Sequence, residues 1–269
     1  NMRLGMGLGL GNLLSGQPIT GMSNKYSFNF DGSNDYLDIS LDNGIVDRAT
    51  IHSTGITFSA WVKVDNVSGT KSVVGQGTST GNALYTGGGL YIQDNNLRMI
   101  IYAGSNYVTL DGSISLSADT WYHVAGTYDG QSATDKLRIY VNGSLDATSS
   151  ALGGDLIDDT YDIAYIGRNV KSTTPNYFDG LIDEVAVWGT ALSADDVAKI
   201  ASKPVDFSKA STYATDRTSN LKLWLRAGDK AEPESTTAIA RQDFYTDFDG
   251  TNDYVSVPTL FSGGNAYSV

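Results

Sequence analysis

The stretch from Leu181 to Trp188 constrains the fold of this chain more than any other part of the sequence. It reads Leu-Ile-Asp-Glu-Val-Ala-Val-Trp, a run of the length and composition of one β-strand. Side chains alternate between the two faces of a strand. This predicts one face with Leu181, Asp183, Val185 and Val187 and an opposite face with Ile182, Glu184, Ala186 and Trp188. Both faces are largely apolar, so we expect a central strand that is covered on each side.

Asp183 is the residue of this strand that needs an explanation. Burying a carboxylate costs several kcal/mol unless it is hydrogen-bonded, paired with a cation or bound to a metal ion. The sequence therefore predicts a partner for Asp183, and the identity of that partner bears on function.

Composition excludes several classes of protein. The net charge of −12 argues against nucleic acid and anionic membrane surfaces as main partners. The sequence has no cysteine, which excludes disulfides and thiolate chemistry. It also has no run of about 18 apolar residues, so we expect no insertion into a membrane.

The chain before and after this stretch predicts an all-β fold. Short alternating runs separated by Gly, Asn and Ser recur from residue 26 to residue 167, and Asn142-Gly143 between two such runs is typical of a type I′ hairpin. One short helix is expected at 190–202, with Ser193 as its N-cap. We therefore expect a jelly-roll sandwich of two antiparallel sheets with one short helix near the end of the domain.

An internal repeat sets the expected domain boundaries. Phe248-Asp-Gly-Thr-Asn-Asp-Tyr254 restates Phe30-Asp-Gly-Ser-Asn-Asp-Tyr36. The expected divisions are an N-terminal arm at 1–22, a β-sandwich domain at 23–203, a linker at 204–220 and the start of a second, incomplete repeat at 221–269. The Gly- and Leu-rich arm is a poor match to a secretory signal. We interpret it as a flexible or docking arm that contacts neighbouring subunits of an oligomeric assembly.

Five ordered motifs resemble a laminin-G-like domain of the concanavalin A-like lectin and glucanase superfamily, in its pentraxin-like branch. They are Phe30–Tyr36, Phe58-Ser-Ala-Trp-Val62, Trp121-Tyr-His-Val124, Leu137-Arg-Ile-Tyr-Val-Asn-Gly143 and Phe178-Asp-Gly-Leu-Ile-Asp-Glu-Val185. The resemblance implies a jelly-roll sandwich with carbohydrate- or protein-binding duties, in which calcium is frequent but not universal. Function does not follow from the fold alone.

The resemblance also implies where calcium would bind. It brings the first and last strands of the domain together, which would place Asp31 near Asp183. Calcium prefers carboxylate, amide and carbonyl oxygens, and the candidate ligands are Asp31, Asn34, Asp35 and Asp183. The alternative is that these acids accept hydrogen bonds from turn amides.

Catalysis is not expected. A retaining glycosidase needs two carboxylates about 5–5.5 Å apart, and the chain has only three glutamates. Ala186 and Trp188 follow Glu184 on its strand face, and Glu232 and Glu234 flank a proline. With two histidines that are not at ligand spacing and no cysteine, the sequence predicts no zinc site, and His123 is expected to be a packed or hydrogen-bonded strand residue.

The sequence is most typical of a noncatalytic recognition module. Tyrosines among Gly- and Asn-rich loops could stack on sugars, although most tyrosines of a β-sandwich simply pack; the candidates are Tyr85, Tyr91, Tyr102 and Tyr107. We expect a glycan or a surface protein as ligand. The expected location is the surface of a virion, as a capsid decoration or tail fibre protein. The alternatives are a secreted bacterial surface adhesin and an accessory carbohydrate-binding domain.

Overall fold

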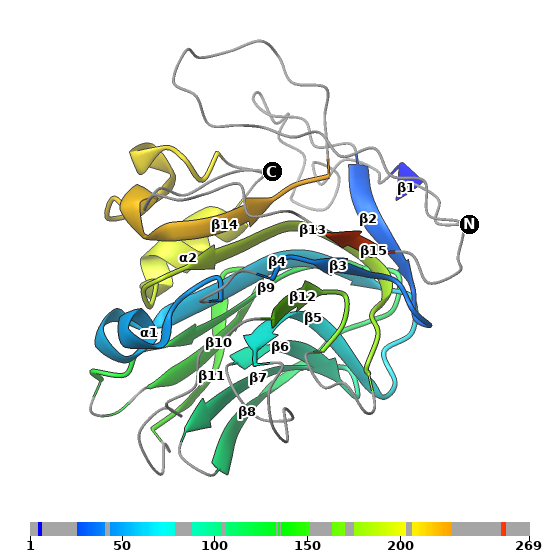
Figure 1. Ribbon diagram of the computed structural model, residues 1–269, viewed down its shortest axis with the longest axis horizontal. Helices are drawn as coiled ribbons and strands as arrows, with labels where there is room; N and C mark the ends of the chain where they lie inside the picture. Colours follow the sequence, from blue (N-terminus) through cyan, green and yellow to red (C-terminus); the bar gives the residue numbers. More distant parts are fainter. Residues whose placement is uncertain are drawn as a thin grey trace.

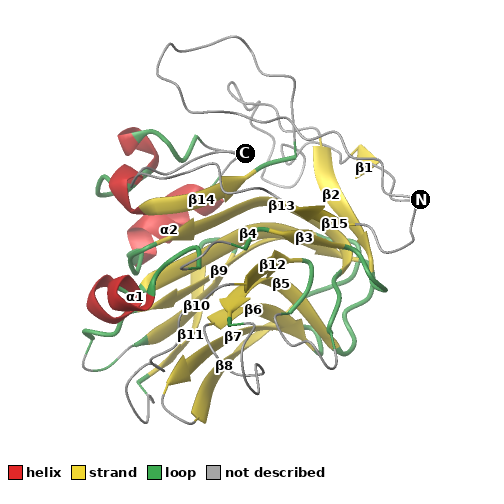
Figure 2. Cartoon of the chain, viewed as in Figure 1, coloured by secondary structure: helices red, strands yellow, loops and turns green. Residues whose placement is uncertain are grey.

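Two antiparallel sheets face each other in the computed structural model and form a jelly-roll sandwich (Figure 1). The structure describes residues 5–6, 26–40, 44–78, 88–103, 106–132, 134, 136–150, 163–169, 175–202, 206–227 and 254–256. Within these ranges the helices gather at one side of the molecule, and strands make up most of the remainder (Figure 2). The predicted fold class is confirmed.

The first sheet has the strand order β1-β2-β13-β4-β9-β10-β11, and β14 also pairs with β13. Its strands are β1 (Gly5–Met6), β2 (Tyr26–Asp31), β4 (Ile56–Val64), β9 (Trp121–Tyr128), β10 (Leu137–Val141), β11 (Ser144–Ser149), β13 (Asp179–Trp188) and β14 (Leu221–Leu225). The hairpin between β10 and β11 turns at Asn142 and Gly143, whose φ angles are 51° and 78°. Two positive φ angles are what the predicted type I′ turn requires.

The second sheet has the strand order β15-β3-β12-β5-β6-β7-β8. Its strands are β3 (Tyr36–Asp38), β5 (Thr70–Gly77), β6 (Gly88–Gln93), β7 (Asn96–Ala103), β8 (Asn106–Ser115), β12 (Ile163–Ile166) and β15 (Tyr254–Ser256). The part of the predicted second repeat that the structure describes includes β15, which pairs in parallel with β3, so that Tyr254 lies opposite Tyr36. The last residue of the repeated motif thus lies beside its counterpart at this edge of the sheet.

A shared apolar core fills the space between the sheets. It includes Phe58 and Val62 of β4, Leu90 of β6, Met99 of β7 and Val187 of β13, all fully buried. Burial of this kind contributes roughly 25 cal/mol for each Å² of apolar surface removed from water. Alternation along each strand places the remaining side chains on the two outer faces of the sandwich.

β13 is an interior strand of the first sheet with paired strands on both sides, as the sequence predicts. β4 pairs with it along one side for most of its length. Its other side is divided between two strands. β2 pairs with the first half, from Asp179 to Ile182, and β14 pairs with the second half, from Val185 to Trp188 (Figure 1).

A β-bulge lies where β13 changes partners, and it corrects the predicted alternation. The register with β4 shifts between Asp183 and Ala186, and Glu184 has a φ of 50°. One extra residue therefore enters the strand. Ile182 faces the core between the sheets together with Val185 and Val187. Asp183 does not share the face of the two valines, because the bulge reverses the pattern.

Among the described residues, two helices cover parts of the sandwich, where the sequence predicts one. The predicted helix is α2 (Ala194–Ala201), and Ser193 caps it by accepting a hydrogen bond from the Asp196 N–H. The additional helix is α1 (Arg48–Thr54). Asp47 caps it by accepting from the Thr50 N–H, and it ends at Gly55, whose φ is 91°. At seven residues α1 is too short to show a helical pattern in the sequence.

The segment predicted as a linker is part of the sandwich domain. Residues 206–227 contain the 3₁₀ turns η2 (Ala210–Thr212) and η3 (Thr218–Asn220) and then β14. Phe207, Tyr213 and Trp224 are buried together with Trp188 in a second apolar cluster on the outer face of the first sheet. The ordered domain therefore extends beyond residue 203, and Leu221–Leu225 completes the first sheet instead of opening a second unit.

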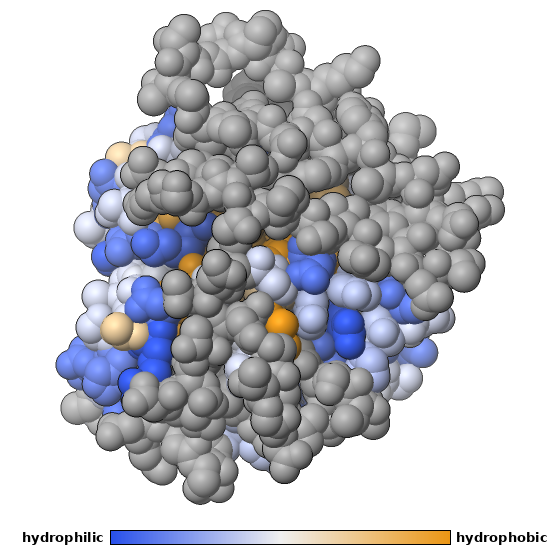
Figure 3. Space-filling model, viewed as in Figure 1, coloured by the Kyte–Doolittle hydropathy of each residue, from blue (hydrophilic) through white to orange (hydrophobic). Residues whose placement is uncertain are grey.

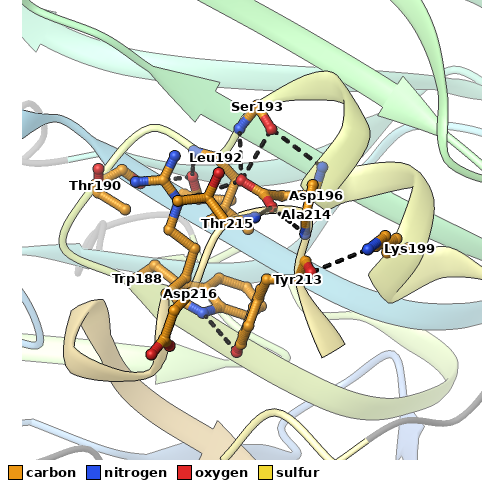
Figure 4. A network of polar contacts seen from close by, with 12 residues as sticks. Trp188, Thr190, Leu192, Ser193, Asp196, Lys199, Tyr213, Ala214, Thr215 and Asp216 are labelled. Atoms are coloured by element: carbon orange, nitrogen blue, oxygen red, sulfur yellow. Dashed lines mark hydrogen bonds and ion pairs between the residues drawn. The ribbon is translucent and has the colours of Figure 1, made fainter. Parts of the chain in front are cut away.

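Asp196 ties this segment to α2 (Figure 4). The side chain is completely buried. Its Oδ1 accepts hydrogen bonds from the Ala214 and Thr215 N–H groups at 2.7 and 3.1 Å, and Arg217 Nε lies 3.2 Å from its Oδ2. Burial raises the pKa of Asp196, but the hydrogen bonds from Thr215, Ser193, Arg217 and Ala214 outweigh it, so the pKa lies below its ordinary value.

Candidate functional site

The outer face of the second sheet carries most of the tyrosines of interest. Leu37, Leu90, Ile92, Leu97, Met99, Ile101, Leu110, Ala164 and Ile166 point into the core. Alternation therefore places their neighbours on the opposite face. These neighbours are Tyr36 and Asp38 of β3, Tyr91 of β6, Arg98 and Tyr102 of β7, Tyr107 and Asp111 of β8 and Tyr165 of β12.

Three of the four predicted sugar-contacting tyrosines share this face, and Tyr85 lies outside the described residues. Tyr107 is 55% exposed, whereas Tyr91 and Tyr102 are 7% and 8% exposed. The rings of Tyr102 and Tyr107 have centroids 5.8 Å apart. Tyr107 is thus the member of this group that a ligand can reach most directly.

Tyr91 is buried because it lies over two glycines. A Cβ added at Gly89 would be 3.4 Å from Cε2 of Tyr91, and one added at Gly75 would be 3.8 Å from its hydroxyl. Gly75 and Gly89 are paired across β5 and β6. Burial raises the pKa of Tyr91 to about 12, so the hydroxyl stays protonated at physiological pH.

A second group on this face escaped the sequence analysis. The guanidinium carbon of Arg168 lies 4.8 Å from the ring centroid of Tyr36, 5.0 Å from that of Tyr165 and 5.9 Å from that of Tyr177. Tyr36 and Tyr165 also meet edge to face at 5.3 Å. The sequence offered a partial signal, since Tyr36 belongs to the repeated motif. The meeting of Tyr36 with Tyr165 and Tyr177 depends on the pairing of β3 with β12.

The surface seen in Figure 3 is mostly hydrophilic where the structure describes it, with small separate apolar areas. A broad apolar patch would indicate a protein or membrane contact. Within the described residues, no helix is both long and apolar enough to cross a membrane.

Of the four predicted calcium ligands, Asp31, Asn34 and Asp35 share one turn, and Asp183 lies apart from them. Asp31 pairs with Asp179 of β13, whereas Asp183 lies four residues further along that strand, about 13 Å away at about 3.3 Å per residue. The Asp183 Oδ1 accepts a hydrogen bond from the Ala227 N–H at 3.0 Å. Asp183 therefore has a backbone N–H group as its hydrogen-bond partner. Its distance from Asp31 follows from the antiparallel register of β2 and β13.

The acids of the Asp31 turn bind turn amides. Asp31 Oδ1 accepts hydrogen bonds from the Ser33 and Asn34 N–H groups at 2.8 and 3.3 Å. Asp35 is buried, and its Oδ2 accepts from the Asp31 N–H at 3.1 Å. Across the part of the chain that the structure describes, no group of three or more His, Cys, Asp or Glu side chains could hold a metal ion. The calcium site stays a prediction from the sequence.

Asp183 and Glu184 form a buried charged group at the bulge. Trp224 Nε1 donates to Glu184 Oε2 at 2.6 Å, and Arg226 Nε lies 3.0 Å from Glu184 Oε1. Burial is the main cause that raises the pKa of Asp183 well above its ordinary value, and the Glu184 charge adds to it. These contacts hold β14 against β13.

The two histidines do not point to catalysis. His52 is on the exposed side of α1. His123 is buried in β9, where its Nε2 lies 2.9 Å from the Ser59 Oγ, and burial lowers its pKa to about 3. Its Nδ1 has no hydrogen-bond partner in the structure, so the acid that orients the histidine of a Ser-His-Asp triad is not found at this position among the described residues.

The comparisons with known proteins agree with this architecture. A laminin G family model, described as the concanavalin A-like lectin/glucanases superfamily, matches residues 23–198. The chain belongs to this superfamily. The match to this lectin/glucanase superfamily ends before η2, η3 and β14. No curated protein sequence matches the chain.

Several solved structures share the lectin/glucanase fold of this chain. The carbohydrate-binding module CBM40 of the Ruminococcus gnavus IT-sialidase, solved with α2,3-sialyllactose, is 21% identical; the alignment covers 65% of this chain and 97% of that chain, with a TM-score of 0.53. A Bacteroides ovatus protein proposed to bind carbohydrate is 23% identical, with a TM-score of 0.52, covering 77% of this chain and 53% of that chain. At these identities the likeness establishes the fold alone.

Proposed function

We propose that this protein is a noncatalytic, lectin-like module that binds a glycan on the outer face of its second sheet. The observation that carries the proposal is the gathering of Tyr36, Tyr91, Tyr102, Tyr107 and Tyr165 on that one face, from five strands. The CBM40 module with its bound sialyllactose supports the same ligand class.

The chemistry of this face suits a sugar. A tyrosine presents an apolar ring that can pack on the C–H face of a pyranose and a hydroxyl that can hydrogen-bond. Carbohydrate and other small-molecule sites combine aromatic surface with a few placed polar groups. Tyr107 supplies an exposed ring, and Tyr36, Tyr165 and Tyr177 are partly exposed.

The absence of catalysis is part of the proposal. Glu184 is 1% exposed, and both of its carboxylate oxygens already have partners, Trp224 and Arg226. A glycosidase needs an acid that reaches the leaving-group oxygen of its substrate. Glu184 cannot do so from beneath β14. Hydrolysis of a glycan by the purified protein, abolished in Glu184→Gln, would overturn this part.

The binding proposal is tested on a glycan array with the Tyr107→Ala variant. We expect binding of one glycan class by the wild type and a loss of at least tenfold in affinity in the variant. The control is Leu145→Ala, which removes a side chain of 51% exposure from β11 in the other sheet. Equal binding by wild type and Tyr107→Ala contradicts the assignment of this face.

We further propose that the module is displayed on the surface of a virion. The sequence supports this through the repeated Asp-Gly-x-Asn-Asp-Tyr motif, because weak sites repeated on one particle bind at high effective concentration. A bacterial surface adhesin and an accessory carbohydrate-binding domain are the competing locations. Mass spectrometry of purified particles decides: recovery only from bacterial envelope fractions removes the virion assignment.

A further inference from the structure

Arg168 is held among aromatic rings on the outer face of the second sheet. Its guanidinium carbon lies within 6 Å of three ring centroids, those of Tyr36, Tyr165 and Tyr177. A guanidinium over an aromatic face is stabilised by the ring quadrupole, by roughly 0.5–1 kcal/mol at exposed sites. The three rings therefore fix the position and the plane of this cation.

Arg168 makes a side-chain hydrogen bond to Tyr36, but its other donors have no partner in the part of the chain that the structure describes. An arginine carries five N–H donors and no acceptor. Arg168 Nε is buried and has no hydrogen-bond partner, and no described carboxylate forms an ion pair with this side chain. Leaving a buried charged donor without an acceptor is costly. Within the described residues, rings hold this cation and no carboxylate neutralises it, in a chain whose net charge is −12.

Arg98 shows how an arginine on the same face is neutralised. Its Nε and Nη2 donate to the two oxygens of Asp111 at 2.5 and 2.8 Å, in the forked geometry that suits a carboxylate. Arg98 therefore has its anion within the fold, across β7 and β8. Among the described residues, Arg168 is instead surrounded by three aromatic rings and is not paired with a carboxylate.

We propose that Arg168 binds the anionic group, a carboxylate or a sulfate, of an acidic saccharide. The inference rests on the proposed function and specifies the class of glycan. The planar fork of the guanidinium can donate two parallel hydrogen bonds to such a group, which a lysine cannot reproduce. Tyr165 and Tyr177 then flank the sugar ring that carries the charge.

One nearby charge opposes the anion. Asp38 lies opposite Tyr165 in the register of β3 and β12, and its charge is among those that act on Tyr36. Its Oδ1 accepts a hydrogen bond from the Ser40 N–H at 3.0 Å. An asparagine would keep that acceptor and lose the negative charge. Asp38→Asn should therefore strengthen the binding of an acidic sugar without disturbing the turn.

The test compares three sugars that differ in charge: 3′-sialyllactose, lactose 3′-sulfate and lactose. Affinities are measured by isothermal titration calorimetry for the wild type, Arg168→Gln, Arg168→Lys and the control Arg138→Gln, whose site lies on β10 of the other sheet. We expect the wild type to favour one or both acidic sugars over lactose. Arg168→Gln should lose at least tenfold in affinity for the acidic sugar and none for lactose. Arg168→Lys should recover only part of that affinity, and Arg138→Gln should change little.

The outcomes separate the inference from the proposed function. Equal affinity for lactose and for both acidic sugars, or equal losses in Arg168→Gln and Arg138→Gln, overturns the inference and leaves glycan binding standing. If none of the sugars binds, the proposed function fails. The inference is then decided by NMR of the Arg168 Nε–H during titration with methyl sulfate: a saturable shift supports it, and no shift overturns it.

Discussion

Replacing Asp196 by alanine tests whether residues 206–217 are a structural part of the domain. The carboxylate joins the first turn of α2 to the chain that follows it (Figure 4). In the Asp196→Ala variant the Ala214 N–H, the Thr215 N–H and the Arg217 guanidinium lose their shared acceptor. Ser193 also loses its side-chain partner at the start of α2.

The expected cost follows from these contacts. A buried donor left without an acceptor costs about 1–3 kcal/mol. The three donors are only partly buried, so the lower end applies to each and gives about 3 kcal/mol in total. For a domain of this size, 1 kcal/mol corresponds to about 2–4 °C in melting temperature. We expect Asp196→Ala to melt about 6–12 °C below the wild type.

The matched control is Asp195→Ala. Asp195 is the neighbouring acid in the first turn of α2 and is exposed. It acts only through the helix dipole, for which about 0.3–1 kcal/mol is typical. Melting is followed by circular dichroism for both variants and the wild type. Equal shifts for the two variants, or a shift below about 2 °C for Asp196→Ala, would refute the role of this carboxylate.

The pH dependence gives a second check. The folded protein holds the pKa of Asp196 below its ordinary value of 3.8. Its contribution to stability is therefore fully present at pH values well above 3.8 and is lost as the pH falls through the lower, folded-state pKa. The gap in stability between wild type and Asp196→Ala should be constant from pH 6 to pH 8 and should close in strong acid.

Three further predictions concern buried or charged groups. Arg226→Met removes the cation beside Glu184 and leaves two buried carboxyl groups, so the free energy of unfolding should fall by about 3–5 kcal/mol. Urea unfolding measures this change, and an unchanged midpoint contradicts the ion pair. The pKa of His123 is about 3 in the folded protein and 6.5 in the unfolded chain, so the native state binds fewer protons than the unfolded state below pH 6.5. The free energy of unfolding should therefore fall as the pH drops below 6.5, by about 2 kcal/mol at pH 5. In His123→Gln this slope should be lost, and an equally steep slope in the variant would exclude His123 as its source. Calcium binding, still a prediction, should raise the melting temperature of the wild type but not of Asp31→Asn; Asp183→Asn should respond like the wild type, because Asp183 lies away from the Asp31 turn.

The sequence predicted the elements that are governed by local chemistry. Asn142-Gly143 forms its turn because both positions need a positive φ. Ser193 caps α2 with a side-chain oxygen three residues from its partner. In both cases the determinant lies within a few residues, so a single sequence is sufficient to find it.

The bulge in β13 could not be found in this way. Leu181–Trp188 contains no glycine or proline to mark the extra residue, and Glu184 adopts its positive φ within the run. The bulge is held by Trp224 and Arg226, which are 40 and 42 residues further along the chain. The assignment of Asp183 to the valine face was wrong for this reason.

The candidate site depends on strand order in the same way. Tyr91, Tyr102 and Tyr107 were predicted one by one from their neighbours in the sequence. Their common face follows from the pairing of β6, β7 and β8. Arg168 and Tyr36 are 132 residues apart in the sequence and meet only because β3 pairs with β12.

Because β2 and β14 share one side of β13, the domain can be truncated only at certain positions. The family match ends at residue 198, and the predicted boundary was 203, yet the strand that completes the sheet is Leu221–Leu225. A fragment ending at Ser202 would leave unpaired those N–H and C=O groups of Val185–Trp188 that face β14, and would leave Trp188 uncovered. Open edges of this kind recruit strands from other molecules. The smallest piece that folds as a monomer should therefore include Ala227, and shorter pieces should aggregate or exchange strands.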